Sequence, residues 1–307
     1  MPIHESEEYQ RAYSLGRSTT DLKELEQVME KFREFLSREP NNALIARHFI
    51  ELISRHLYML ARKNDLAALE DLEKMKALSE KFPEAVLIGE EFLVGIMNVI
   101  GIFGAKFSDK IEEWMGLATK IFERNTRMLN YAEQWMKCAA NSIIVYTKIG
   151  QFDKAEKLLE SLVKYADEWS APAVLVPATA AAYNLLIEYN NMLGTGKITD
   201  TAKMREIYSR IKYLLPLVRK YGKGSETVNG YVYIGIALSQ TIYNAGKLGE
   251  MGDLREFWKE LENMYLQFSK LRNNKDFVES IRNAAHYVYK YIEEDDPLYP
   301  SIEPFLD

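Results

Sequence analysis

The sequence has few of the residues that build metal and redox centres. It contains one cysteine, Cys138, and four histidines among 307 residues. A single cysteine excludes an intrachain disulfide and any zinc or iron–sulfur site made of several cysteines. Cys138 has apolar neighbours and no base nearby in sequence, so we expect a buried, unreactive thiol. His48 and His56 share a helical face without an evident third ligand, and we expect them at the surface or an interface.

Catalytic and nucleotide-binding motifs are also missing. The segment 194–197, Gly-Thr-Gly-Lys, resembles the end of a phosphate loop, but Asn191 stands where the upstream glycine is required and Ile198 follows the lysine. The acidic cluster 293–296 has no second copy and is followed by Pro297, so we expect a solvated segment there and no magnesium site. We therefore predict no catalytic residue, no cofactor, no metal and no enzymatic activity; an all-α enzyme with dispersed catalytic groups is the least favoured alternative.

Long hydrophobic runs and a signal for export are missing as well. The most apolar stretch, residues 92–105, is shorter than the ~20 residues of a membrane-spanning helix and contains Asn98, which favours a buried core helix. The first residues lack the cationic start and apolar core of a secretory signal. We expect a cytoplasmic protein without a membrane partner. A net charge of −6 argues against general affinity for nucleic acid or anionic lipid.

Helical spacing of apolar residues runs through the whole sequence. Between 153 and 169 these residues recur three or four apart, and the segment 254–271 repeats the pattern. No alternating pattern typical of a strand is convincing. Glycine, proline and asparagine fall between the helical segments. The sequence therefore predicts an all-α protein with about thirteen helices.

Aspartates precede helical segments at regular intervals of 44, 44, 44, 47 and 53 residues. An N-cap aspartate accepts hydrogen bonds from the free N–H groups of the first turn. Four of the six are followed by glutamate three residues later, which resembles a capping box. We predict that these aspartates are helix caps of one repeat: Asp21, Asp65, Asp109, Asp153, Asp200 and Asp253.

The segments between the aspartate-led helices are apolar around more of their circumference. They are residues 44–60, 92–103, 135–146 and 231–238. A helix that is apolar on all sides must be covered on several sides, and a stack of helical hairpins provides this cover. We predict a single repeat domain of about six hairpins over residues 1–296.

One segment resembles a known repeat family. Residues 146–155 are similar to the helix–turn–helix corner of a tetratricopeptide repeat. Tyr146 matches the tyrosine that closes the first helix, Gly150 the turn, Phe152 the aromatic residue after it, and Ala155 the small residue that allows close packing. The match covers about residues 134–167, with fainter echoes elsewhere.

The chain also departs from that family. The small residue of the first helix would fall at Ile143 and the early tryptophan at Ala139, and the period is near 44 where the family has about 34. The resemblance implies a right-handed α/α superhelix, or solenoid, with elongated units. It also implies a non-enzymatic scaffold or adaptor that binds a protein or peptide. The sequence leaves self-association into a homo-oligomer open.

Basic residues gather in one stretch of this acidic chain. Residues 171–224 contain eight Lys or Arg against three Asp or Glu. Within a helix expected over about 200–221, Arg205, Lys212 and Arg219 recur every seven residues, and Lys223 would extend the row. The plain interpretation, which we favour, is a solvated face; the sharper hypothesis is a docking surface for an acidic peptide, a phosphorylated segment or RNA, with these four residues as its candidates. RNA or nucleoprotein binding through residues 200–223 is the alternative function.

The last eleven residues, 297–307, form an acidic tail with three prolines and no basic residue. Prolines prevent it from continuing a helix. Its apolar side chains, which include Leu298, Ile302 and Phe305, are too many for an idle tail. We expect the tail to pack back as a cap, which repeat arrays need; the alternative is a linear motif for another protein.

Overall fold

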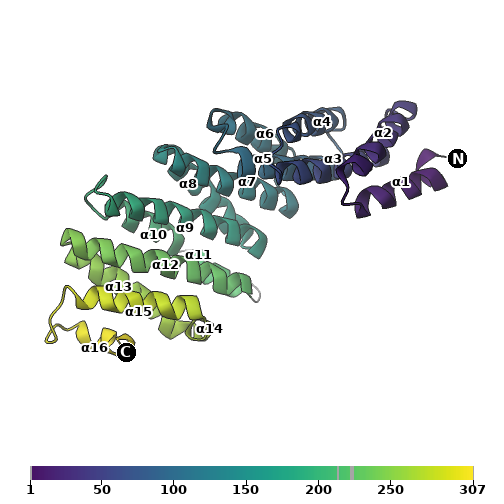
Figure 1. Cartoon of the computed structure of the whole chain (residues 1–307). Coiled ribbons are helices and arrows are strands. Elements are labelled where there is room, and N and C mark those ends of the chain that lie inside the picture. Colours follow the sequence, from purple (N-terminus) through teal and green to yellow (C-terminus); the bar gives the residue numbers. More distant parts are fainter. Residues whose placement is uncertain (1, 213, 222–224, 307) are drawn as a thin grey trace. The chain divides into compact units, whose positions relative to one another are not determined.

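The computed structural model describes residues 2–212, 214–221 and 225–306 (Figure 1). Over these residues it contains α-helices, three short 3-10 helices and no strand, which confirms the all-α prediction. The chain separates by its contacts into two units, residues 1–145 and 146–307, which are described one after the other. The single repeat domain over 1–296 stays a prediction.

The first unit consists of consecutive helices joined by short loops. The elements are η1 (Ile3–Glu5), α1 (Glu7–Ser18), α2 (Leu22–Arg38), α3 (Ala43–Ala61), α4 (Ala67–Lys81), α5 (Val86–Phe103), η2 (Ser108–Lys110), α6 (Ile111–Arg124) and α7 (Leu129–Lys148), which crosses into the second unit after Val145. Helix α3 contacts α1, α2, α4 and α5, and α5 contacts α3, α4 and α6. These two helices are therefore the centre of the unit.

Central and peripheral helices differ in burial as the apolar spacing predicts. Helix α2 buries a single stripe that includes Leu25, Phe32 and Phe35, whereas α3 buries residues around most of its circumference. Among the described residues, only α5 has the length and apolar composition of a membrane span, and half of it is buried in the protein. Its packing is that of a core helix, because α3, α4 and α6 cover it.

Hydrogen bonds in the first unit join residues one predicted repeat apart. They run from Tyr131 Oη to Val86 O (2.7 Å), from Asn141 Nδ2 to Met97 O (3.2 Å), from Cys138 Sγ to Leu93 O (3.5 Å) and from Arg124 Nη1 to Ser79 O (3.3 Å). The sequence separations are 44 or 45 residues. Helix α7 thus lies beside α5, and α6 beside α4, at the same interval as the first four aspartates.

The second unit also consists of consecutive helices. Its helices are α8 (Phe152–Trp169), α9 (Pro172–Gly194), α10 (Ala202–Lys212), α11 (Leu214–Tyr221), α12 (Ser225–Leu248), α13 (Met251–Gln267), α14 (Ser269–Arg272), α15 (Lys275–Tyr289), α16 (Tyr299–Ile302) and the 3-10 helix η3 (Glu303–Phe305). Figure 1 shows α9, α12 and α15 side by side, and α12 contacts both of its neighbours. Helices α10 and α11 pack on α9, and α13 packs on α12 and α15.

Buried amides join the long helices α9 and α12. Asn190 Nδ2 donates to Ala237 O and to Thr241 Oγ1, both at 3.1 Å. Asn244 Nδ2 donates to Asn190 O and Oδ1, also at 3.1 Å. These pairs lie 47 to 54 residues apart, close to the longer intervals between the last aspartates.

The corner between α7 and α8 has the geometry that its sequence suggests. Gly150 adopts a φ of +78°, a left-handed conformation that glycine tolerates without strain. Gln151 N donates to Tyr146 O at 2.8 Å and closes the turn. Ala155 is fully buried, and the Phe152 ring lies 5.1 Å from that of Tyr189 on α9.

Three of the six aspartates accept a backbone hydrogen bond at the start of a helix, and Asp65 does so from the position before the N-cap, Leu66. Asp21 is the N-cap of α2 and accepts a hydrogen bond from Glu24 N at 2.9 Å. Asp65 accepts from Ala67 N and Asp200 from Ala202 N, each at 3.0 Å, at the starts of α4 and α10.

The capping prediction is wrong for the other three aspartates. Asp109 lies within the 3-10 helix η2, and α6 follows from Lys110 without a side-chain cap. Asp153 and Asp253 lie inside the first turns of α8 and α13, where the N-cap positions belong to other residues. An N-cap residue needs an extended backbone, and a position already in a helical turn cannot provide it.

Within the segment expected to be helical over about 200–221, the structure describes α10 (Ala202–Lys212) and α11 (Leu214–Tyr221), and residue 213 lies outside the described residues. Pro216 lies in the first turn of α11 as described, where a missing N–H is tolerated.

The C-terminal segment packs against the second unit. Ile302 in α16 is fully buried, and Leu298 is nearly so. Trp258 Nε1 on α13 donates to Ser301 Oγ at 2.8 Å, and the edge of the Trp258 ring meets the Phe305 ring at 5.9 Å. The apolar side chains of this segment therefore cover α13 and the neighbouring α15.

Candidate partner-binding site

The predicted basic row faces a second row on α13. Arg205 and Lys212 lie on α10, and Arg219 lies on α11; Lys223 lies outside the described residues. Helix α13 carries Asp253, Glu260 and Gln267, which are also seven residues apart. Two basic residues of the row, Arg205 and Lys212, each contact the acidic residue of α13 that lies 48 positions later in the sequence.

The first position of the two rows is an ion pair. The Arg205 guanidinium donates to Asp253 Oδ1, and Thr201 donates its hydroxyl to Oδ2 of the same carboxylate. The Asp253 side chain is 9% exposed and that of Arg205 is 48% exposed. Asp253 is therefore engaged in holding α10 against α13, which explains why it does not cap its own helix.

The second position is also paired. Lys212 Nζ contacts Glu260 Oε1, and Tyr208 donates its hydroxyl to Glu260 Oε2 at 3.3 Å. Burial and the neighbouring Glu260 carboxylate raise the pKa of Tyr208 well above its usual range, so the phenol remains a hydrogen-bond donor. The Lys212 charge is thus neutralised at the surface.

At the third position the pattern changes. Arg219 lines the same cleft as Gln267, which carries no charge, and among the described residues no carboxylate is paired with this guanidinium. Its guanidinium carbon lies 5.5 Å from the centroid of the Phe268 ring, within the range of a cation–π contact. The charges of Arg205 and Lys212 are therefore compensated within the chain, and partner binding by the basic row stays a prediction.

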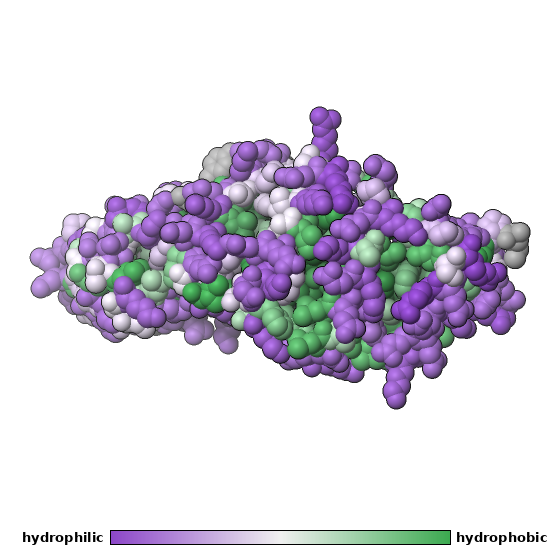
Figure 2. Space-filling model, turned by 90° about the horizontal axis from the view of Figure 1, so that it is seen from above, coloured by the Kyte–Doolittle hydropathy of each residue, from purple (hydrophilic) through white to green (hydrophobic). Residues whose placement is uncertain are grey.

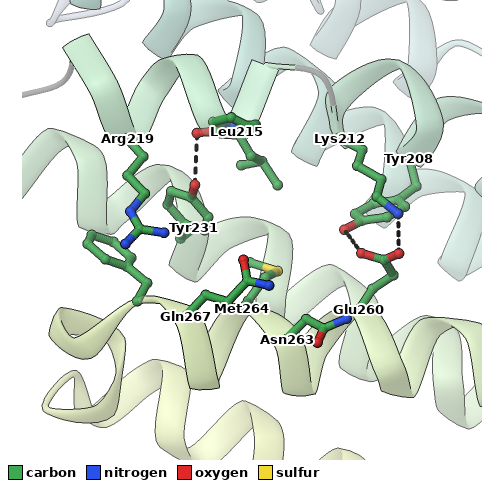
Figure 3. A pocket seen from close by; sticks show the side chains of 11 residues that line it. Tyr208, Lys212, Leu215, Arg219, Tyr231, Glu260, Asn263, Met264 and Gln267 are labelled. Atoms are coloured by element: carbon green, nitrogen blue, oxygen red, sulfur yellow. Dashed lines mark hydrogen bonds and ion pairs between the residues drawn. The ribbon is translucent and has the colours of Figure 1, made fainter.

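A cleft of about 220 Å³ opens beside Arg219, between α10 and α11 on one side and α13 on the other (Figure 3). Its lining residues are Tyr208, Lys212, Leu215, Pro216, Arg219, Tyr231, Glu260, Asn263, Met264, Gln267 and Phe268. Figure 3 shows Arg219 at one end and the Lys212–Glu260 pair at the other, with Gln267 and Asn263 between them. The site combines one uncompensated cation, two exposed amides and apolar walls.

Tyr231 fixes the floor of the cleft. Its hydroxyl donates to Leu215 O at 2.8 Å and so ties α12 to α11. Burial raises the pKa of Tyr231 to about 12, although the charge of Arg219 opposes the shift. The Tyr231 phenol therefore stays protonated and hydrogen-bonded to a backbone carbonyl, where it stabilises the contact between α12 and α11. The polar groups that remain for a ligand are those of α11 and α13.

Large apolar side chains are also exposed outside this cleft. Figure 2 shows a face that is mostly hydrophilic, with apolar side chains between charged ones. The large apolar side chains that are exposed come from many separate helices and include Leu15, Leu87, Tyr233 and Leu266. Scattered apolar residues are normal on protein surfaces and do not indicate an interface by themselves.

The prediction of surface or interface histidines is wrong for His56. Its side chain is 7% exposed, its Nδ1 lies 2.5 Å from Asp71 Oδ2, and its Nε2 lies 3.4 Å from Glu26 Oε1. The sequence alone hides this cluster because its members lie on three helices. His48 is half-buried and stacks on Tyr13 with a centroid distance of 3.8 Å.

Cys138 is fully buried, as its apolar neighbours predict. Burial raises the pKa of its thiol far above the usual range, so it is no nucleophile near neutral pH. In the part of the chain that the structure describes, no three His, Cys, Asp or Glu side chains are grouped as metal ligands. Comparison with protein-family models, with curated proteins and with solved structures gives no match to this chain.

Proposed function

We propose that this chain is a non-enzymatic scaffold or adaptor that binds a protein or peptide, built as a right-handed, tetratricopeptide-like superhelix of helical hairpins. The repeat interval supports the architecture. Hydrogen bonds join neighbouring layers at separations of 44 or 45 residues in the first unit and 47 to 54 in the second. The corner at Tyr146–Ala155 supports the likeness to the family, because Gly150 turns the chain and Ala155 lies at the helix contact.

The observation that carries the proposed function is the cleft beside Arg219. Its volume of about 220 Å³ is below the range of about 300–1,000 Å³ that is typical of small-molecule sites. It suits one or two side chains of a peptide. Arginine and aromatic residues dominate the binding energy at protein interfaces, and the cleft presents Arg219 over Phe268 at its edge.

RNA binding through residues 200–223 is less well supported. A protein that holds the phosphate backbone neutralises several phosphates with free Lys and Arg side chains. Two of the three described cations of the row already pair with Asp253 and Glu260. The remaining single cation is too little for a track along a nucleic acid.

Selection from a random peptide library displayed on phage tests the proposed function. The purified full-length chain is the bait, and the same chain unfolded in denaturant and then adsorbed is the control bait. We expect a family of related peptides that is enriched on the folded chain only. Failure to enrich any peptide over the control bait, in repeated selections at low salt, would contradict peptide binding.

A further inference from the structure

The geometry points to the ligand chemistry of the cleft: we propose that it binds the carboxylate of an aspartate or glutamate side chain in a peptide, followed by an apolar residue. This inference rests on the proposed function and specifies what the same site recognises. In this interpretation the peptide supplies the acidic group that no described residue of the chain provides to Arg219.

The first argument is the register of the two rows. Arg205 meets Asp253 and Lys212 meets Glu260 at one offset, so the position opposite Arg219 is Gln267. Two positions are ion pairs, and at the third no carboxylate in the described part of the chain pairs with Arg219. The cleft lies at this third position, where a carboxylate from outside would meet the Arg219 guanidinium in the same way that Asp253 meets Arg205.

The second argument is the local charge. Lys212 and Arg219 contribute two positive charges to the lining, and Glu260 contributes one negative charge. One net positive charge matches a carboxylate, which carries a single negative charge. A phosphate group carries about −1.5 to −2 near pH 7 and would lie close to the Glu260 carboxylate, which repels it. The charge therefore favours a carboxylate over a phosphorylated residue.

The third argument is the composition of the walls. Leu215 and Met264 are nearly buried beneath the cleft, and Phe268 closes one end. The exposed amides of Asn263 and Gln267 lie between Arg219 and the Lys212–Glu260 pair (Figure 3). A carboxylate at Arg219 therefore has amide donors beside it and apolar surface below it, which suits an apolar side chain next to the acid.

Three fluorescein-labelled peptide libraries test the ligand chemistry. Each library has one fixed central pair, which is Glu-Leu, Gln-Leu or phosphoserine-Leu, between randomised positions. Fluorescence anisotropy with the full-length chain gives the dissociation constant of each library. Because a hydrogen bond to a charged group contributes more than one between neutral groups, we expect the Glu-Leu library to bind about tenfold more tightly than the Gln-Leu library. Equal binding of these two libraries, or tighter binding of the phosphoserine library, would overturn the inference.

Two substitutions locate the binding. Arg219→Gln removes the cation, and Gln267→Glu supplies an internal carboxylate that occupies it. Both should reduce Glu-Leu binding to the level of Gln-Leu. Lys164→Gln removes an exposed charge on α8, outside the cleft, and should leave binding unchanged. If Gln267→Glu retains the full Glu-Leu preference, the carboxylate binds elsewhere and the inference fails. Peptides that are enriched in the phage selection but are indifferent to Arg219→Gln leave the proposed function intact and reject only this site.

Discussion

His56 Nδ1 and Asp71 Oδ2 lie 2.5 Å apart inside the first unit, where Asp71 is fully buried. Lys74 Nζ contacts the other carboxylate oxygen at 2.7 Å, and Glu26 lies on the far side of the imidazole. Burial alone would lower the pKa of His56, but the hydrogen bond and charge of Asp71, together with those of Glu26, outweigh it and raise the pKa above the usual value of about 6.5. The folded state therefore favours the imidazolium.

This pair makes stability depend on pH in a defined direction. Because the folded pKa of His56 is raised, its contribution to the free energy of unfolding is complete below about pH 6.5 and is lost as the pH rises through the folded value. We expect His56→Gln to cost about 1–3 kcal/mol at pH 6, through the loss of a buried hydrogen bond to a charged group, and less at pH 9. Urea unfolding followed by circular dichroism between pH 5 and 9 measures the difference.

His48 provides the matched control for the pH series. Burial lowers its pKa, so its contribution is present above about pH 6.5 and is lost as the pH falls through the folded value. The difference between wild type and His48→Gln should therefore grow with rising pH, while that of His56→Gln shrinks. A His56→Gln difference that is constant across the series would show that Asp71 does not hold a protonated imidazole.

Close helix packing predicts opposite outcomes for two glycines. A Cβ atom at Gly89 on α5 would lie 2.1 Å from the Tyr131 hydroxyl, which donates to Val86 O, whereas a Cβ atom at Gly116 on α6 would meet nothing within 4 Å. We expect Gly89→Ala to destabilise the chain by about 1–3 kcal/mol through overpacking. Gly116→Ala should stabilise it by about 0.5–1 kcal/mol, because alanine is the better helix former. Thermal melting of both variants measures this, and equal melting temperatures would contradict the α5–α7 contact.

The corrected caps give a third prediction. Asp21→Ala should cost about 0.5–2 kcal/mol, because Asp21 accepts from Glu24 N at the start of α2. Asp109→Ala should change stability by less than about 0.5 kcal/mol, since Asp109 accepts no capping hydrogen bond that would be lost. Urea unfolding of the two variants compares them directly. A larger loss for Asp109→Ala would contradict the correction made for Asp109 and show that its carboxylate supports the start of α6.

The sequence predicts the all-α fold class well because helix formation depends on local spacing. Apolar periodicity identifies the helices, and the interval of 44 residues recurs in the hydrogen bonds between layers. Cap positions are less certain, because a few residues around each aspartate decide where the backbone first becomes helical. At Asp153 the turn at Gly150 places the start of α8 at Phe152, one residue before the aspartate.

The candidate site could be predicted only in part. The seven-residue spacing places Arg205, Lys212 and Arg219 on one face, but it does not show what that face meets. The matching spacing of Asp253, Glu260 and Gln267 is visible in the sequence and would have revealed two compensated positions and one without an acid. Recognising it requires knowing that α13 lies against α10, which follows from the packing of the hairpins. The His56 cluster has no such signal.

The C-terminal segment gives the last prediction. Ile302 is fully buried, and Trp258 donates to Ser301. Arg255 pairs with Asp296 through Nη1 and Nη2, which lowers the pKa of that carboxyl to about 2. If this segment is the cap that repeat arrays need, Ile302→Ala should cost about 2–5 kcal/mol as a buried aliphatic truncation. Leu266→Ala, at a side chain that is 57% exposed on α13, should cost less than about 0.5 kcal/mol.

Limited proteolysis then separates a cap from a linear motif. If the segment is a cap, proteinase K should not cleave the chain after Asp296 until the second unit unfolds. The contacts of Ile302 and Phe305 hold the backbone of the segment in place. The Ile302→Ala variant should lose the segment sooner and melt at a lower temperature. Rapid cleavage of residues 297–307 from the wild type, with no change in melting temperature, would contradict a cap. The cover of α13 and α15 would then contribute nothing to stability, and the segment would be available to another protein.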